Sequence, residues 1–350
     1  RREQVRACPC PSRTQMTQPD KTAPRRPQFQ PTSSLIKVII FRVLPVSLCL
    51  FALVVVAGRM VGDISRFFQW LSWIPVLVLL PVLLVALLLS LKGSGRGSGV
   101  LRLVCGGFLF LALIWTVTID YAFLRTIDQR EDDLVLVNWN ATILPGEDSF
   151  EEALLHSNQA LQVLTDLDAD VLIIFNGSYL RLSSEWKAFE DRFTHAARSA
   201  MVMVLSDHEI LEVRPILVTR GSLIISIRVS HLGEERVIWG VDLPSSPKLS
   251  RSDLFASLRA QVDEMNQAEP DLLLGDFNVP RGSRSLKRAF PDFRSAFSEA
   301  GSGWHGTWPS KLPLWDLDQV LVGPDLAPVR YEVVTPPIGM HRIQKVVLRW

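Results

Sequence analysis

The feature that most constrains this chain is an uncharged, largely apolar stretch of 22 residues, WLSWIPVLVLLPVLLVALLLSL, at positions 70–91. Two further apolar runs flank it, one at about 43–61 and one at about 103–119. A helix of roughly 20 apolar residues crosses the hydrocarbon core of a bilayer. The sequence therefore predicts three transmembrane helices that form an anchor over residues 35–120. The alternative is a buried helical hairpin in a soluble protein.

The Lys and Arg residues around these runs predict the orientation of the anchor. Basic residues are concentrated before the first run and between the second and third, namely Arg25, Arg26, Lys37, Arg42, Lys92, Arg96 and Arg102. The loop between the first two runs has only Arg59 and Arg66, beside Asp63. Loops rich in Lys and Arg stay in the cytoplasm. We expect a multi-pass protein of a bacterial cytoplasmic (inner) membrane, with a cytoplasmic N-terminus and an extracytoplasmic C-terminal domain at 121–350.

The first 34 residues differ from the rest of the chain. They are rich in Pro, Gln, Thr and Arg and have little to bury, which predicts a disordered basic tail. The chain begins with Arg1, and Met16 is the expected translation start, so Cys8 and Cys10 are not interpreted as a metal site. No cysteine lies beyond Cys105, and the C-terminal domain therefore has neither a disulfide nor a thiolate metal site.

The charge is divided between the two parts of the chain. Residues before 121 include 14 Lys/Arg and 4 Asp/Glu, a balance of +10, whereas the remaining residues include 23 and 32, a balance of −9. Proteins that bind nucleic acid broadly use basic surfaces to neutralise phosphates. Broad nucleic-acid binding by the C-terminal domain is therefore not expected, and the bilayer and a phosphoester substrate are the expected partners.

After residue 120 short β-rich runs alternate with polar helices. Expected strands are 134–139, 171–175, 200–205, 211–218, 223–229, 236–242, 271–275, 318–322 and 345–349, and expected helices are 149–165, 184–198 and 251–267. Ser149 and Glu152 have the spacing of a capping box, and HLGEER at 231–236 predicts a hairpin. Many strands with few helices predict a two-sheet sandwich with helices outside it, a mixed α/β (α+β) fold.

Polar residues follow the apolar runs where the strands are expected to end. The apolar run LLL at 272–274 leads into GDFN, which contains Asp276 and Asn278. Other expected strand ends carry Asn138, Asn140, Asn176 and Asp242, and the last segments contain Asp318 in WDLDQVLVG and His341 in GMHRIQ. A turn that only caps a strand is the alternative interpretation of Asp276 and Asn278.

In this order the residues resemble the endonuclease/exonuclease/phosphatase superfamily, the fold of deoxyribonuclease I. GDFN at 275–278 is the most specific element, supported by GTWP at 306–309 and by WDLDQVLV. The resemblance implies a four-layer αββα sandwich and metal-assisted phosphoester hydrolysis. It implies that Asp276 is the general base, that Asn278 orients water or phosphate, that Asn140 lines the site, and that Asp318 orients His341.

Several positions depart from the pattern of this superfamily. Asn176 stands where a metal-binding glutamate is usual, and Met340 stands where a second carboxylate is usual. Asp242 replaces a histidine before a Leu-Pro loop, and Gln319 replaces another after Asp318. The metal ligands are therefore unknown, and binding of Mg²⁺ or Mn²⁺ is expected only if Asp242, Asp276 and amide oxygens compensate. His231, in SHLGEER, imitates a family motif but lies at the expected hairpin tip, so no role is assigned to it.

Three spans followed by such a domain resemble the bacterial teicoplanin-resistance membrane proteins. That resemblance implies a membrane-anchored phosphohydrolase or phosphodiesterase that acts near the membrane, with a lipid-linked pyrophosphate as the implied substrate. The eroded metal positions leave a second hypothesis, a catalytically inactive pseudoenzyme that serves as a binding module of the envelope. A nuclease is the third hypothesis, and the acidic charge of the domain disfavours it.

Overall fold

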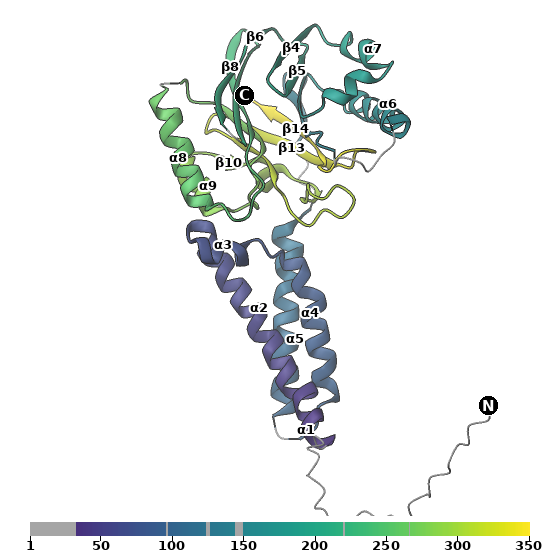
Figure 1. Ribbon diagram of the computed structural model, residues 1–350, viewed down its shortest axis with the longest axis vertical. Coiled ribbons are helices and arrows are strands. Elements are labelled where there is room, and N and C mark those ends of the chain that lie inside the picture. Colours follow the sequence, from purple (N-terminus) through teal and green to yellow (C-terminus); the bar gives the residue numbers. More distant parts are fainter. Residues whose placement is uncertain (1–32, 96, 124–126, 144–149, 220, 266) are drawn as a thin grey trace, which may run out of the picture.

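A computed structural model describes residues 33–350 apart from 96, 124–126, 144–149, 220 and 266. A bundle of long helices forms one part of the molecule and a β-sandwich forms the other (Figure 1). The expected tail, except for its last two residues, and Met16 lie outside the described residues, and so does Ser149 of the expected capping box.

Two continuous helices of the bundle are long and apolar enough to cross a membrane. The first covers Leu35–Ile64 and runs from within α1 (Ser33–Val38) through η1 (Ile39–Val43) and α2 (Leu44–Val61) to the end of η2 (Gly62–Ile64). The second covers Ser98–Asp120 and consists of α5 (Ser98–Trp115) and η3 (Thr116–Asp120). The expected spans at 43–61 and 103–119 lie inside these two helices.

The prediction of one continuous helix at 70–91 is wrong. The structure divides this stretch into α3 (Arg66–Ser72) and α4 (Val76–Lys92), which meet at an angle of 71°. Pro75 lies at the break and has an extended backbone. Proline has no N–H to donate and disfavours a helical conformation in the residue before it, which favours a break at Ile74, although α4 continues through Pro81. The pair counts as a third span only if its two arms are taken together.

The sandwich consists of two six-stranded sheets. The first has the order β10 (Arg294–Ser295), β12 (Asp318–Val322), β9 (Leu272–Asp276), β8 (Glu234–Asp242), β7 (Ser222–His231) and β6 (Ile210–Thr219). The second has the order β13 (Ala327–Val334), β14 (Ile343–Arg349), β2 (Leu134–Asn140), β3 (Val171–Phe175), β5 (Val202–Ser206) and β4 (His195–Ser199). The short strands β1 (Tyr121–Ala122) and β11 (Gly303–Trp304) pair with each other.

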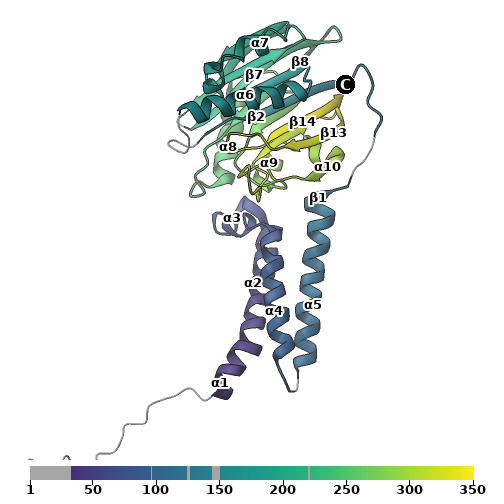
Figure 2. The ribbon, with the colours of Figure 1, turned by 90° about the vertical axis from the view of Figure 1, so that its right-hand side faces the viewer.

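Side chains that alternate along the strands separate the core into layers. Leu272, Leu274 and Val320 pack between the sheets, whereas Leu273 faces outward. Helices α8 (Arg251–Glu264) and α9 (Arg284–Ala289) cover the outer face of the first sheet (Figure 1), and α6 (Phe150–Asp166) and α7 (Trp186–Glu190) cover that of the second (Figure 2). The two sheets lie between layers of helices as the sequence predicted, and the short helices α9, η4 (Ser178–Leu182) and α10 (Ala296–Ala300) were not predicted.

In the second sheet one local prediction is wrong and one strand was not predicted. The expected helix at 184–198 ends as α7 at Glu190, and His195–Ser199 is instead the edge strand β4. This strand pairs with β5 through a tight connection in which Ala200 has a positive φ of 51°. The pairing with a neighbouring strand outweighs the local preference of Ala and Arg for a helix. Strand β13, with Pro328 and charged residues in it, was not predicted.

Candidate active site

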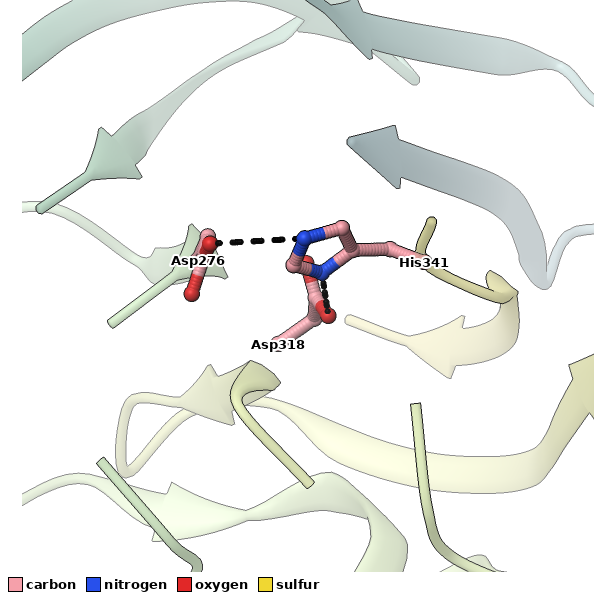
Figure 3. A group of neighbouring side chains, drawn as sticks. All are labelled: Asp276, Asp318 and His341. Atoms are coloured by element: carbon pink, nitrogen blue, oxygen red, sulfur yellow. Dashed lines mark hydrogen bonds and ion pairs between the residues drawn. The ribbon is translucent and has the colours of Figure 1, made fainter. Parts of the chain in front are cut away.

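Polar side chains from both sheets meet at one edge of the sandwich. Asp242 and Asp276 end the parallel neighbours β8 and β9 and lie in register, and Asp318 begins β12 directly opposite Asp276. Asn140 ends β2 in the other sheet, and His341 comes just before β14. Because all these strand ends lie at the same edge, residues far apart in the sequence come together there (Figure 3).

The GDFN turn places Asp276 by its backbone geometry. Gly275 has a φ of +123°, and a Cβ at this position would lie 2.0 Å from the carbonyl oxygen of Val241. Only glycine allows this close approach of β9 to β8. Asn278 also has a positive φ, its backbone N–H donates to Asp276 Oδ1 over 2.9 Å, and its side-chain amide donates to the Leu243 carbonyl over 2.7 Å. Asn278 therefore holds the turn, and its side-chain amide is directed to the loop after β8.

His341 is held between two carboxylates. Its Nδ1 lies 2.8 Å from Asp318 Oδ2, and its Nε2 lies 3.9 Å from Asp276 Oδ2 (Figure 3). Asp318 is fixed by its backbone N–H, which donates to Thr307 Oγ1 over 3.1 Å. Burial lowers the pKa of His341, but the neighbouring carboxylates, Asp318 first, more than offset this and raise the pKa to about 9. The imidazole is therefore protonated at neutral pH.

A chain of amides connects the remaining carboxylates. The Asn140 Nδ2 donates to Asp276 Oδ2 over 3.2 Å. The Asn176 Nδ2 donates to Asn140 Oδ1 over 3.0 Å and to Asp242 Oδ2 over 3.1 Å. Burial raises the pKa of Asp242, and burial together with the Asp318 charge raises the pKa of Asp276 to about 8. Seven of the eight polar residues named from the sequence therefore lie in one connected cluster, with Asn278 at its margin. The eighth, Asn138, instead donates to Gln344 Oε1 over 2.8 Å.

Other residues of the cluster were not predicted individually. Thr142 donates to Asn140 Oδ1 over 2.7 Å, and Gln344 donates to the backbone carbonyl of Asp318 over 2.7 Å. Thr307 belongs to the GTWP segment, but the sequence did not indicate that its hydroxyl accepts hydrogen bonds from the Asp318 segment. The Met340 backbone donates to the Thr142 carbonyl over 2.8 Å, so this position joins two loops of the edge.

His231 lies at the other end of the sandwich. It pairs with Glu234 in the β7–β8 hairpin, whereas Asp242 ends the same strand β8 at the edge that carries the cluster. Its ring contacts those of His208 and Trp350. The residue therefore has no place in the cluster.

The donor chemistry of the cluster fits a divalent cation. Oxygen atoms of Asp276 and Asp318 and a ring nitrogen of His341 lie within 4.8 Å of one another. Within the described residues, Asp318 Oδ1 is buried without a hydrogen-bond partner, and three carboxylates share the cluster with one imidazolium. Magnesium and manganese prefer oxygen ligands that include carboxylates. Asp276 and Asp242 would hold such an ion together with Asp318 Oδ1, whereas protonated His341 would not be a ligand.

A match to a family model identifies the family of the chain. The model of the Endonuclease/Exonuclease/phosphatase family matches residues 93–343. The chain belongs to this family. Members of the family are generally hydrolases that act on phosphoesters, and they typically use divalent metals.

Solved structures to which the chain is similar share little sequence with it. Mannosyl-6-phosphatase Bt3783 of Bacteroides thetaiotaomicron VPI-5482 is 15% identical with a TM-score of 0.51, and the match covers 62% of this chain and 100% of that one. Truncated TDP2 of Caenorhabditis elegans is 14% identical with a TM-score of 0.49, covering 64% and 100%. An endonuclease/exonuclease/phosphatase of Bacteroides vulgatus is 13% identical with a TM-score of 0.48, covering 62% and 98%. Comparison with curated protein sequences gives no match.

Proposed function

We propose that the chain is a membrane-anchored phosphoester hydrolase whose substrate is carried by the membrane, with a lipid-linked pyrophosphate as the specific candidate. The family supports hydrolysis of a phosphoester. The two apolar helices support anchoring, and the bent pair of α3 and α4 is proposed as a third span. With the Lys and Arg distribution, three crossings would give a cytoplasmic N-terminus and an extracytoplasmic sandwich.

The observation that carries the proposal is the direction in which the clustered edge faces. Gln69 of α3 donates to the carbonyls of Pro247 and Leu249, both over 2.9 Å, in the loop that follows Asp242. Trp315, three residues before Asp318, donates through Nε1 to the Trp73 carbonyl over 2.7 Å. Loops of the catalytic edge thus rest on the end of the helix bundle (Figure 1). A phosphoester at the bilayer surface would be close to this edge.

The side chains of the cluster suit proton transfer in phosphoester hydrolysis. Asp276 would accept a proton from the attacking water in its ionised form, which is populated as the pH rises through its pKa of about 8. His341 Nε2 would donate to an oxygen of the phosphoryl group or of the leaving group, while Asp318 holds Nδ1 and fixes the ring. An oxygen atom seated beside Asp276 and His341 would be within hydrogen-bond reach of both.

A divalent cation, when bound, would supply neutralisation of charge on the phosphoryl oxygens. The side-chain amides of Asn176 and Asn140 hold the carboxyl groups of Asp242 and Asp276 close together. These two carboxyl groups would bind the cation. Asn278 keeps the Asp276 carboxylate in place through its backbone N–H.

The test is phosphate release by the full chain in nanodiscs, from a lipid pyrophosphate and from a soluble chromogenic phosphodiester, with Mg²⁺ or Mn²⁺ and with EDTA. We expect cation-dependent turnover that Asp276→Ala abolishes. His231→Ala serves as the control, because this histidine lies at the opposite end of the sandwich. Turnover of no phosphoester with either cation would contradict the hydrolase, and turnover of the soluble substrate alone would contradict only the membrane-borne substrate.

A second candidate function is a binding module without catalysis. The Asn176 amide donates to both Asn140 and Asp242, so an N–H group points toward the carboxylates at the position where the family usually has a metal-binding glutamate. Calorimetry that detects no binding of Mg²⁺ or Mn²⁺, together with unchanged cellular function of Asp276→Ala, would favour this candidate over the hydrolase.

A further inference from the structure

A cavity of about 590 Å³ lies between the helix bundle and the sandwich, apart from the catalytic cluster. Gln319 and Leu321 of β12 line it, whereas Asp318 and Val320 of the same strand point between the sheets. Successive side chains of a strand face opposite sides. The cavity therefore opens on the outer face of the first sheet, and it has the size of a small-molecule site.

The cavity has an excess of positive charge. Five Lys and Arg residues line it, namely Arg59, Arg281, Arg284, Lys287 and Arg294, with His305, and only two carboxylates do, Asp120 and Asp316. Both carboxylates are paired: Asp316 with Arg281 and His305, and Asp120 with His305. Within the described part of the chain, no carboxylate lies within ion-pair distance of Arg59, Arg284 or Lys287. The cavity therefore favours an anion.

An apolar slot of about 140 Å³ among α2, α4 and α5 borders on the same cavity. Arg59 and Trp115 line both spaces, and the slot continues between Ala52, Leu83 and Phe108. Arg59 is fixed there because its Nη1 donates to the carbonyls of Ser72 over 3.0 Å and Ile74 over 2.8 Å, at the break between α3 and α4. Tryptophan near the end of an apolar helix is typical of the membrane–water interface.

We infer that the cavity and the slot together form a binding site for an anionic phospholipid, with the phosphate headgroup beside Arg284 and Lys287 and an acyl chain in the slot. The phosphate matches Arg284 and Lys287, which have no carboxylate partner among the described residues, although Lys287 Nζ also donates to the Phe293 carbonyl over 3.0 Å. The acyl chain matches the apolar lining below Arg59 and Trp115. This inference rests on the membrane anchoring proposed above and on no part of the hydrolysis.

The test measures lipid retained by the full chain after extraction from nanodiscs that contain phosphatidylcholine with or without phosphatidylglycerol, by native mass spectrometry. We expect retention of phosphatidylglycerol but not phosphatidylcholine, and about tenfold weaker retention by the double variant Arg284→Ala, Lys287→Ala. Arg288→Ala is the matched control, since Arg288 is an exposed cation of the same helix α9 that does not line the cavity. Equal retention by the double variant and the control would overturn the inference.

A second arm separates a lipid headgroup from a soluble phosphate. Ala112→Phe adds a bulky side chain to the slot and should weaken retention of phosphatidylglycerol, whereas inorganic phosphate should not displace the lipid. Displacement by inorganic phosphate, or unchanged retention by a folded Ala112→Phe protein, would overturn the acyl-chain part. Because the readout is binding, its failure is distinguishable from a failure of phosphoester turnover.

Discussion

At the scale of single residues, the electrostatics of the candidate catalytic cluster are governed by the excess of carboxylates around one imidazole. Asp318 contacts His341 Nδ1 over 2.8 Å, and Asp276 and Asp242 add their charges from β9 and β8. The carboxylates raise the pKa of His341 to about 9, whereas burial first and then the Asp318 charge raise the pKa of Asp276 to about 8, which the His341 charge partly offsets. Each group is thereby tuned by the others, so a substitution at one should be detectable in the titration of another.

Substitution of Asp318 tests this coupling. In the proposed mechanism His341 acts protonated, so activity should fall as the pH rises through its pKa, near 9 in the native protein. Asp318→Asn removes the main cause of the raised pKa, and the alkaline fall of kcat/KM should move toward the ordinary value of 6.5. His341→Gln should lower kcat by roughly 10²-fold or more and remove this fall. An alkaline limb that Asp318→Asn leaves in place would contradict the role of His341.

Asn176 offers a test of the cation side of the cluster. Asn176→Glu removes two side-chain hydrogen bonds and adds a fourth carboxylate beside Asp242, so the protein in EDTA should lose ~1–3 kcal/mol of unfolding free energy. Mg²⁺ should restore much of this loss, because a bound cation stabilises the folded state. The measurement is the Tm of the native protein and of the variant, each in EDTA and in Mg²⁺. If Mg²⁺ does not change the Tm of the variant, a cation site in the cluster is contradicted.

At the scale of helices and strands, the structure shows which sequence patterns were sufficient. The LLLGDFN pattern predicted both the buried strand β9 and the polar turn after it, because a short apolar run, a glycine and an Asx turn are all local features. Pro75 and the strand β4 show the limit. The uninterrupted apolar character of 70–91 predicted one continuous helix and gave no sign of the break at Pro75. Residues 195–199 have a local preference for a helix but form a strand, because they pair with β5.

The β8–β9 approach gives a prediction at this scale. Gly275→Ala would place a Cβ 2.0 Å from the Val241 carbonyl oxygen, which forces the two strands apart and should cost ~3–5 kcal/mol of unfolding free energy. Gly233→Ala is the control, because Gly233 also has a positive φ, of +81°, but no atom lies within 4 Å of the added Cβ. The Gly233→Ala substitution should lower the free energy of unfolding by only ~1 kcal/mol, through backbone strain. Chemical denaturation of both variants would reveal the difference, and equal losses would contradict the steric account.

At the scale of the whole molecule, the sequence predicted the apolar part and the sandwich separately but not how they fit together. Asp63 lies between two apolar runs and was counted only as a loop charge, yet it accepts hydrogen bonds from the backbone N–H groups of Arg284 and Ser285 over 2.9 and 3.1 Å. Gln69 likewise accepts from the Arg251 N–H over 2.9 Å. Such contacts span more than 180 residues of sequence, and no local pattern encodes them.

Asp63 therefore provides the test of the joint between bundle and sandwich. Asp63→Ala leaves the two N–H groups at the start of α9 without their acceptor, and hydrogen exchange at Arg284 and Ser285 should accelerate roughly tenfold, as for the loss of a helix cap. Asp292→Ala, at an exposed aspartate that follows α9, is the matched control and should leave this exchange unchanged. If the joint positions the catalytic edge above the membrane, Asp63→Ala should also slow turnover of a lipid pyrophosphate more than that of a soluble phosphodiester. Equal slowing of both substrates would mean that Asp63 supports the folding of the edge and not its position, because only position distinguishes a substrate held in the bilayer from one in solution.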